Sequence, residues 1–154
     1  MLFVLFQLGD DRYALDAGRV AAVLPWVRMT RIAHAPAGIA GLFDYHGTPL
    51  PALDLSELTL GRPADRRLST RIVVVHYDDP GSAPRQLGLI AEKATSTIRR
   101  DPAEFVASGL AHSGAPYLRR VLADARGLVQ WVDIDRLLTA SMRDALAFPQ
   151  HVET

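Results

Sequence analysis

The sequence predicts a mainly β protein built from small barrels. Short apolar runs of strand-forming residues recur along the 154-residue chain, and turn residues separate them at short intervals. The clearest run, Arg71 to Tyr77, reads RIVVVHY, and its β-branched residues predict a strand that is buried on both faces. Strands this short, with turn signals this regular, favour small β-barrels over a parallel α/β sheet.

The first part of the chain is expected to form a series of short strands. Gly9-Asp10-Asp11 predicts a polar turn after the first strand, and His46-Gly47 predicts a tight hairpin turn. A side chain at such a turn tip tends to face solvent, which makes His46 a candidate for contact with a partner. The expected strands are Leu2 to Leu8, a second strand from Tyr13, Val20 to Leu24, Met29 to Ala33, Gly41 to Tyr45 and Leu50 to Leu53.

The second part is expected to add strands at Leu87 to Ala91 and Ala94 to Ile98, and two helices. Asp101-Pro102 combines a cap residue with proline at the first helical position, and predicts a helix of about two turns that stops at Gly109. Asp133 begins a C-terminal helix, because acidic residues suit the positive end of the helix dipole. One apolar face is expected on this helix, formed by Ile134, Leu137, Leu138, Met142, Ala145 and Leu146.

A weak internal repeat links the two parts. Leu53 to Leu58 and Val132 to Leu137 share one pattern: an apolar residue, aspartate, an apolar residue, two polar residues and leucine. Each copy follows an apolar strand that begins at a glycine, Gly47 in one and Gly127 in the other. The repeat predicts a strand that runs into a capped turn or helix, used twice, as in a protein built from two similar barrels.

Composition argues against several classes of protein. Lysine plus arginine equals aspartate plus glutamate, at 17 each, so the zero net charge does not favour binding to nucleic acid or to a membrane surface. Without cysteine, disulfides and thiolate chemistry are excluded. The apolar N-terminus lacks the basic region of a signal peptide, and no run reaches the ~18 residues of a membrane helix. We therefore expect a cytoplasmic protein with no direct membrane insertion.

Catalytic, cofactor-binding and metal-binding motifs are missing. The five histidines form no HExxH or His-x-His motif, and no glycine-rich phosphate-binding loop occurs. A hydrolytic set of His34, His46, Asp54 and Ser56 can be imagined, but Ser56 lies outside a Gly-x-Ser-x-Gly elbow. We interpret Asp54 and Ser56 as a helix cap. No catalytic residue, cofactor or metal is therefore expected.

Other polar and aromatic residues have plain structural interpretations. His76, at the end of the Arg71 to Tyr77 strand, is expected to be structural, and Trp26 suits either a core or an interface. Three dibasic pairs are interpreted as solvated surface: Arg66-Arg67, Arg99-Arg100 and Arg119-Arg120.

Several short motifs follow one another in an order that is more specific than any one of them. They are Phe6-x-Leu8-Gly9, Tyr13 to Asp16, Val20 to Val23, Thr30 to Ala33 with Pro36, Ile39 to Gly47, Pro51-x-x-Asp54-Leu55, the RIVVV strand, Leu87 to Ile90 and Trp131 to Ile134. Together they cover nearly the whole chain and resemble the CheW-like domain, a coupling module of bacterial chemosensory arrays. The resemblance implies two five-stranded SH3-like β-barrels that share a hydrophobic core, with a C-terminal helix.

The resemblance also implies a function and two partners. A CheW-like protein is a noncatalytic adaptor that couples chemoreceptors to a CheA-type histidine kinase. Its partners would be the cytoplasmic tip of a chemoreceptor, bound in a groove on the first barrel, and the kinase's own CheW-like regulatory domain, bound at other edges. Such a protein would be recruited to membrane-associated receptor arrays. The receptor-binding residues expected in this chain are Val20, Ala22, Val23, Tyr45 and His46.

Two positions depart from the family pattern. The family commonly has Asn-x-Arg-Gly where this chain has Asp44-Tyr45-His46-Gly47, and often has an acidic residue in place of Ala22. In the family those two positions are expected to form a charged pair beside the receptor groove. Loss of both partners can be nearly neutral for folding, so the departure affects the expected choice of receptor instead. A dedicated pathway, such as a Wsp-type surface-sensing system, would suit it.

Three other functions are alternatives at this stage. An isolated regulatory piece of a kinase would need catalytic and dimerisation segments, which do not fit in 154 residues. A small hydrolase would need a catalytic set that the sequence does not supply. The third alternative is a β-barrel module that binds a small ligand or a protein outside chemotaxis. The CheW-like domain, with two intertwined barrel subdomains, is expected at residues 1–147, with 148–154 as a C-terminal tail.

Overall fold

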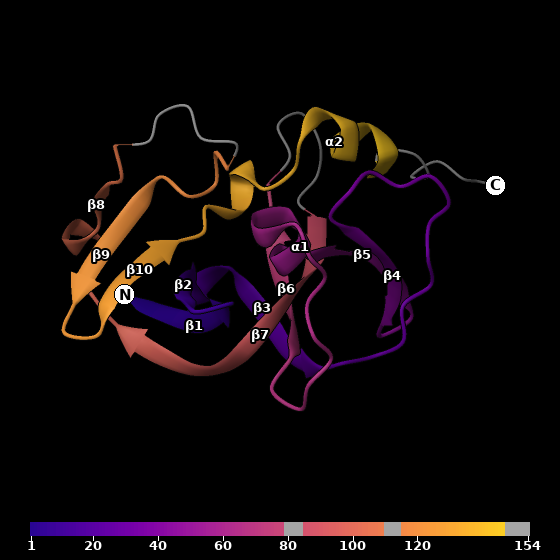
Figure 1. Ribbon diagram of the computed structural model, residues 1–154. Coiled ribbons are helices and arrows are strands. Elements are labelled where there is room, and N and C mark those ends of the chain that lie inside the picture. Colours follow the sequence, from indigo (N-terminus) through magenta and orange to yellow (C-terminus); the bar gives the residue numbers. More distant parts are fainter. Residues whose placement is uncertain (79–84, 110–114, 147–154) are drawn as a thin grey trace.

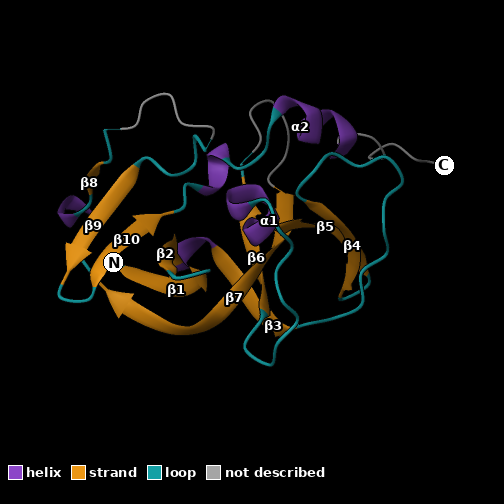
Figure 2. Cartoon of the chain, viewed as in Figure 1, coloured by secondary structure: helices purple, strands orange, loops and turns teal. Residues whose placement is uncertain are grey.

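The computed structural model describes residues 1–78, 85–109 and 115–146 (Figure 1, Figure 2). Its strands form one hydrogen-bonded network in the order β3-β6-β7-β1-β2-β10-β9-β8, which β4 and β5 join through β7. No helix in these residues is long and apolar enough to cross a membrane. The strands are β1 (Leu2–Leu8), β2 (Asp11–Asp16), β3 (Val20–Pro25), β4 (Ile39–Tyr45), β5 (Thr48–Asp54), β6 (Arg71–Tyr77), β7 (Arg85–Arg99), β8 (Val106–Ala107), β9 (Arg120–Asp124) and β10 (Gly127–Trp131). The helices are α1 (Leu55–Leu60), α2 (Ala140–Leu146) and the 3₁₀ turns η1 (Ala17–Arg19), η2 (Pro102–Glu104) and η3 (Ile134–Arg136).

The network folds into two barrels that share strand β7. We name as the terminal barrel the set of β1, β2, β8, β9, β10 and the second half of β7, because it holds strands from both ends of the chain. The central barrel consists of β3 to β6 and the first half of β7. Figure 1 shows β7 running from one barrel to the other. The mainly β class is confirmed, and the short β8 adds to the five strands expected in the terminal barrel.

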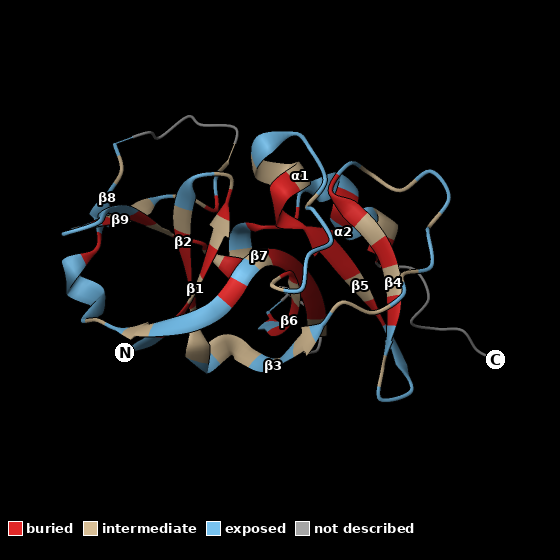
Figure 3. Ribbon diagram, turned by 60° about the horizontal axis from the view of Figure 1, so that its bottom comes forward, coloured by how far each residue is buried: buried red, intermediate tan, exposed pale blue. Residues whose placement is uncertain are grey.

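Alternation along the strands divides their side chains among three apolar clusters. In β6, Ile72 and Val74 belong to the cluster inside the central barrel, whereas Val73 and Val75 belong to the cluster between the barrels. Successive side chains of a strand face opposite sides, so both faces of β6 are buried, as the sequence predicts. Figure 3 shows this burial concentrated in β5, β6 and part of β7. The cluster inside the terminal barrel consists of Phe3, Ala14, Phe105, Leu122, Val129 and Trp131.

The two strands expected at residues 87–91 and 94–98 are one continuous strand. Residues 85–91 of β7 pair with β6, and the later residues pair with β1. Lys93, the single lysine of the chain, has a left-handed φ of +53° where the register with β1 shifts. A bulge of this kind bends a strand and increases its twist, which here redirects β7 from the central to the terminal barrel.

The expected strand at residues 29–33 is wrong. Only Thr30 is paired, through a bridge in which the N–H groups of Thr30 and Leu42 donate to each other's carbonyl oxygens at 2.7 and 2.8 Å. Gly41 allows this close approach, since a Cβ there would lie 2.4 Å from the Thr30 carbonyl oxygen. The bridge brings this segment against β4, although it is too short to count as a strand.

The two-turn helix expected after Asp101 is also wrong. The capping box is present, with Asp101 and Glu104 each accepting the other's backbone N–H, but only the 3₁₀ turn η2 follows. Phe105 then enters the terminal-barrel cluster against Phe3 and Trp131, at ring-centroid distances of 5.1 and 5.0 Å. Burial of this aromatic ring directs the chain into β8 and stops the helix.

The C-terminal helix exists but is interrupted. The turn η3 and the helix α2 are separated at residues 137–139, and Thr139 restarts the helix because its hydroxyl accepts the Met142 N–H at 3.2 Å. Five of the six residues expected on the apolar face are buried in the cluster between the barrels, and Ala145 is half-buried. Those five are Ile134, Leu137, Leu138, Met142 and Leu146.

The internal repeat corresponds to one structural unit used twice. A hairpin followed by a short helix occurs as β4-β5-α1 in the central barrel and as β9-β10-η3 in the terminal barrel. The second strand of each unit also makes a parallel pairing, β5 with β7 and β10 with β2. Asp54 and Asp133 occupy the same N-cap position in the two copies, but only Asp54 makes a side-chain cap hydrogen bond.

A bidentate ion pair ties the first hairpin to β9. The Arg12 guanidinium donates to both carboxylate oxygens of Asp124, at 2.5 and 3.0 Å. This hydrogen bonding, supplemented by the Arg126 N–H, lowers the pKa of Asp124 to about 2. The pair joins residues that are 112 positions apart in the sequence and therefore stabilises the closure of the terminal barrel.

The Asp124 carboxyl should make folding stability depend on pH in the acid range. A carboxyl whose pKa is lower in the folded state stabilises the fold above its unfolded pKa of about 4, and this contribution is lost as the pH falls through about 2. Asp124→Asn should therefore be less stable than wild type at pH 6, with a difference that shrinks at pH 3. Urea unfolding at the two pH values measures this, and a difference that does not change with pH would refute it.

Candidate functional site

The turn between β4 and β5 presents the side chain of His46 to solvent. Tyr45 and Thr48 form the last pair of the hairpin, which leaves His46 and Gly47 as the turn. Both turn residues have positive φ, +53° and +87°, as a type I′ turn requires. The Asp44 carboxylate accepts a hydrogen bond of 2.8 Å from the Gly47 N–H and fixes the turn. The His46 side chain is exposed, as its place at the tip of the turn predicts.

Tyr45 connects this tip to the core. Its ring contacts that of His46, with centroids 4.4 Å apart, and it also packs against the central-barrel cluster, which includes Phe43 and Leu50. The tip is therefore attached to the packed core of the central barrel through an aromatic residue. A partner that contacts His46 would meet a side chain whose backbone and neighbour are already positioned.

The other candidate residues lie on β3. Val23 is 43% exposed, Ala22 is half-buried against the central-barrel cluster, and Val20 packs against the cluster between the barrels. A register shift in the pairing with β6 occurs between Val20 and Ala22. The five candidates thus do not form one uniformly exposed patch, because only Val23 and His46 are exposed.

Strand directions place the start of β3 near the end of β4. β3 is antiparallel to β6, β6 to β7 and β4 to β5, whereas β5 is parallel to β7. β3 and β4 therefore run in opposite directions, so that Val20 and Tyr45 lie at the same end of the central barrel. The five candidates therefore all belong to the central barrel.

Arg19 anchors the start of β3, a role that the sequence did not indicate. Its guanidinium donates to the Asp135 carboxylate at 2.6 and 3.2 Å, and to the His76 carbonyl oxygen at 2.7 and 3.1 Å. The hydrogen bond from Arg19 lowers the pKa of Asp135. The His76 side chain is exposed, so the structural role expected of this residue is performed by its backbone carbonyl group. Arg19 thereby holds β3 against the end of β6.

Asp54 is a helix cap, as the sequence predicts. One carboxylate oxygen accepts the N–H groups of Ser56 and Glu57 at 3.0 and 3.2 Å, and the other accepts the Ala64 N–H at 2.9 Å. Burial raises the pKa of Asp54, and these three donors oppose the rise. The Ser56 hydroxyl oxygen is buried and has no hydrogen-bond partner among the residues that the structure describes.

The imagined hydrolytic set is not assembled. His46 and Asp54 lie near opposite ends of the seven-residue strand β5, which spans about 20 Å at the usual rise per residue. Both carboxylate oxygens of Asp54 are occupied, and Ser56 is enclosed. Among the described residues, no group of three or more histidine, aspartate or glutamate side chains could hold a metal ion.

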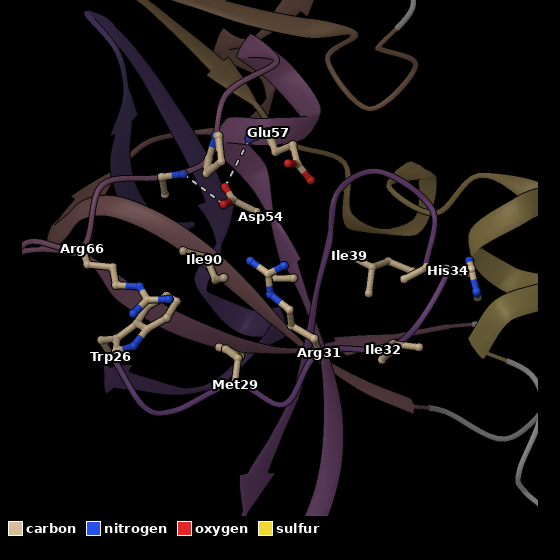
Figure 4. Close-up of a pocket in the computed structure, with 14 residues that line it drawn as sticks. Trp26, Met29, Arg31, Ile32, His34, Ile39, Asp54, Glu57, Arg66 and Ile90 are labelled. Atoms are coloured by element: carbon tan, nitrogen blue, oxygen red, sulfur yellow. Dashed lines mark hydrogen bonds between the residues drawn. The ribbon is translucent and has the colours of Figure 1, made fainter.

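A cavity lies beside Asp54 (Figure 4). Asp54 ends β5 and His46 precedes that strand, so the cavity is at the far end of the central barrel from His46. Its volume is about 410 Å³, and its walls include Trp26, Arg31, Arg66 and Ile90. No pattern in the sequence indicates this cavity, because the residues that line it come from segments separated by tens of positions. The only signals were Trp26 next to a proline and the Arg66-Arg67 pair, which we interpreted as solvated surface.

Comparison with known proteins identifies the family. The family model of the CheW-like domain matches residues 2–142. The chain is 24% identical over 147 residues to the chemotaxis protein CheW of Rhizobium meliloti strain 1021, which covers 92% of this chain and 90% of that protein. It is also 24% identical to the chemotaxis protein CheW of Klebsiella aerogenes, over 90% of this chain and 81% of that protein.

A solved structure with the same fold is that of the scaffolding protein TtCheW from Thermoanaerobacter tengcongensis. The TM-score is 0.78 at 20% sequence identity, and the match covers 92% of this chain and 89% of the other. The shared fold agrees with the two SH3-like barrels described above. Since the family model matches nearly the entire chain, the protein belongs to the family of CheW-like domains.

Proposed function

We propose that this protein is a noncatalytic adaptor that couples chemoreceptors to a CheA-type histidine kinase in bacterial chemosensory signalling. The observation that carries the proposal is the family match over residues 2–142. It is supported by relatives named as chemotaxis proteins that align with most of their own length. We propose the whole of residues 1–147 as the functional domain; residues 147–154 lie outside the described part of the chain.

The proposed receptor-binding surface is the end of the central barrel that carries the β4-β5 tip and the start of β3. His46 and Val23 supply its exposed side chains, while Ala22 and Tyr45 support them from the central-barrel cluster. Val20 has a positioning role, since it packs between the barrels beside the Arg19 anchor. The proposed partner is the cytoplasmic tip of a chemoreceptor. A second partner, the kinase's regulatory domain, would bind elsewhere and bring the protein to receptor arrays.

The departures from the family pattern give the proposed surface its own chemistry. Neither His46 nor Ala22 provides the permanent charges that the family pattern places at these positions. A receptor that fits this surface would therefore present an apolar or hydrogen-bonding contact in place of a charged one. This supports a dedicated pathway, such as a Wsp-type surface-sensing system, as the context of the protein.

His46→Asn should weaken receptor binding about tenfold, an effect of ~1.4 kcal/mol. The imidazole is the side chain that the tip offers to a partner, and asparagine keeps the left-handed backbone that His46 adopts. For that reason the free energy of unfolding should change by only about 0.5 kcal/mol. Pull-down of the receptor's cytoplasmic fragment, together with thermal melts, measures both quantities.

Arg126→Gln is the matched control for this variant. Arg126 is exposed in the turn between β9 and β10, the equivalent hairpin of the terminal barrel, and its change should leave receptor binding as in wild type. If His46→Asn and wild type bind the receptor equally well, the receptor binds at another surface of the protein. A large fall in melting temperature with unchanged binding would make His46 a structural residue.

A further inference from the structure

The cavity beside Asp54 combines two guanidinium groups with an aromatic wall. Figure 4 shows Arg31 extending into its middle toward Asp54, and Arg66 lying on Trp26 at one side. The Arg66 guanidinium carbon is 4.6 Å from the centre of the Trp26 ring. Stacking on an aromatic face orients a guanidinium while leaving its N–H donors in the ring plane available to a ligand.

The carboxylates in the cavity wall are already used by the backbone. Asp54 accepts three N–H groups, and one Glu57 oxygen accepts the Gly38 N–H at 2.6 Å. In the described part of the chain, neither Arg31 nor Arg66 forms an ion pair with a carboxylate. The cavity therefore offers two sets of charged donors that no carboxylate of the barrel occupies.

We propose that this cavity binds a carboxylate side chain carried by an acidic peptide segment of a partner protein. Arg31 and Arg66 are the donors, because a planar guanidinium pairs with a carboxylate through two parallel hydrogen bonds. Trp26, Ile39 and Ile90 supply an apolar wall for the methylene groups of that side chain. A cavity of about 410 Å³ accommodates a side chain of this size with its adjacent backbone.

The loop that carries Arg66 favours a peptide over a small free anion. Leu68 lies two residues further along this loop and is 96% exposed. The loop is folded back on itself, since the Thr70 hydroxyl donates to the Asp65 carbonyl oxygen and accepts the Arg67 N–H. A peptide anchored in the cavity can cover Leu68 with a neighbouring apolar residue, which an anion confined to the cavity cannot.

This site is separate from the proposed receptor surface. β5 runs between them, so about 20 Å lies between the hairpin tip and the cavity. The two surfaces can be occupied at once, and the inference does not depend on the identity of the partner at His46. Binding here should weaken as salt is added, because the attraction is between charges at a partly open site.

The test uses the full chain, labelled with ¹⁵N, and the synthetic peptide acetyl-Leu-Glu-Glu-Leu-amide. We expect chemical-shift changes at Ala35, Ile39 and Ala64, which line the cavity, and none at Gly47. The glutamine analogue, acetyl-Leu-Gln-Gln-Leu-amide, should bind at least about tenfold more weakly. Absence of shifts at the cavity up to about 10 mM peptide, or equal shifts with both peptides, overturns the proposal.

Variants separate the contributions of the residues. Arg31→Gln and Arg66→Gln should each weaken the binding of the peptide about tenfold, whereas Arg126→Gln in the distant β9-β10 turn should not change it. Leu68→Ser should weaken the peptide several-fold and leave the binding of sodium acetate unchanged. If acetate binds as tightly as the peptide and Leu68→Ser has no effect, the site takes small anions and the peptide proposal is wrong. Thermal melts of each variant verify that the fold is retained.

Discussion

Replacing Leu138 with alanine should lower the free energy of unfolding by about 2 to 5 kcal/mol. Leu138 is 7% exposed and lies in the cluster between the two barrels, in the short segment that joins η3 to α2. Its removal would leave a cavity at the point where both barrels and the C-terminal helix meet. Urea unfolding followed by circular dichroism measures the change.

Leu128→Ala provides the matched comparison for this variant. Leu128 is in β10 and is 62% exposed, so its truncation should change the free energy of unfolding by only about 0.5 kcal/mol. If both variants lose a similar amount of unfolding free energy, the cluster between the barrels does not hold the two barrels together as described.

Gly88→Ala should destabilise the protein by roughly 3 kcal/mol, at the upper end of the usual cost of overpacking a core. A Cβ on Gly88 would lie 2.4 and 2.7 Å from two ring atoms of Phe43 and 2.9 Å from Ile72. These side chains are buried in the central barrel, so the surrounding structure has little room to move. Chemical denaturation of the variant, monitored as for Leu138→Ala, gives the loss.

Rescue by a second change tests the cause of the Gly88→Ala effect. Phe43→Leu removes the ring atoms that a new Cβ would meet, so the double variant should be more stable than the sum of the two single losses predicts. Purely additive losses would show that contact with Phe43 is not the reason for the destabilisation.

The parts of the fold that depend on neighbouring residues could be predicted from the sequence. The RIVVV run of β6 indicated burial on both faces, and the structure divides its side chains between two clusters. The turn at His46-Gly47 was predictable because a tight hairpin requires residues that tolerate positive φ. The capping role of Asp54 was predictable because two of its three donors, the N–H groups of Ser56 and Glu57, lie within three residues. The third donor, the Ala64 N–H, is ten residues away and was not predictable.

Helix lengths could not be predicted in this way. Asp101 and Glu104 carry a correct capping signal, yet burial of Phe105 against Trp131 ends the helix after one turn. The helix restarts at α2 because Thr139 caps it. This capping role could not be predicted without knowing that Leu137 and Leu138 are both buried in the core. In both cases tertiary packing overrides a local preference.

The candidate site was only partly accessible from the sequence. The exposure of His46 followed from local turn chemistry, whereas the anchoring of β3 by Arg19 depends on Asp135, which is 116 positions away. The cavity between Trp26, Arg31 and Arg66 also requires the folded barrel, because no local pattern distinguishes an arginine that lines a cavity from one in solvent. Long-range contacts of this kind become visible only when the strand order is known.

A protein that connects a chemoreceptor to a histidine kinase should bring the kinase to membranes that carry the receptor. The most direct measurement is sedimentation of the kinase with membrane vesicles that contain the native receptor, in the presence and absence of the purified protein. We expect the kinase to sediment with the vesicles only when the protein is present. His46→Asn should reduce the sedimented fraction of the kinase, and Arg126→Gln should not. Equal sedimentation of the kinase with and without the protein would contradict it.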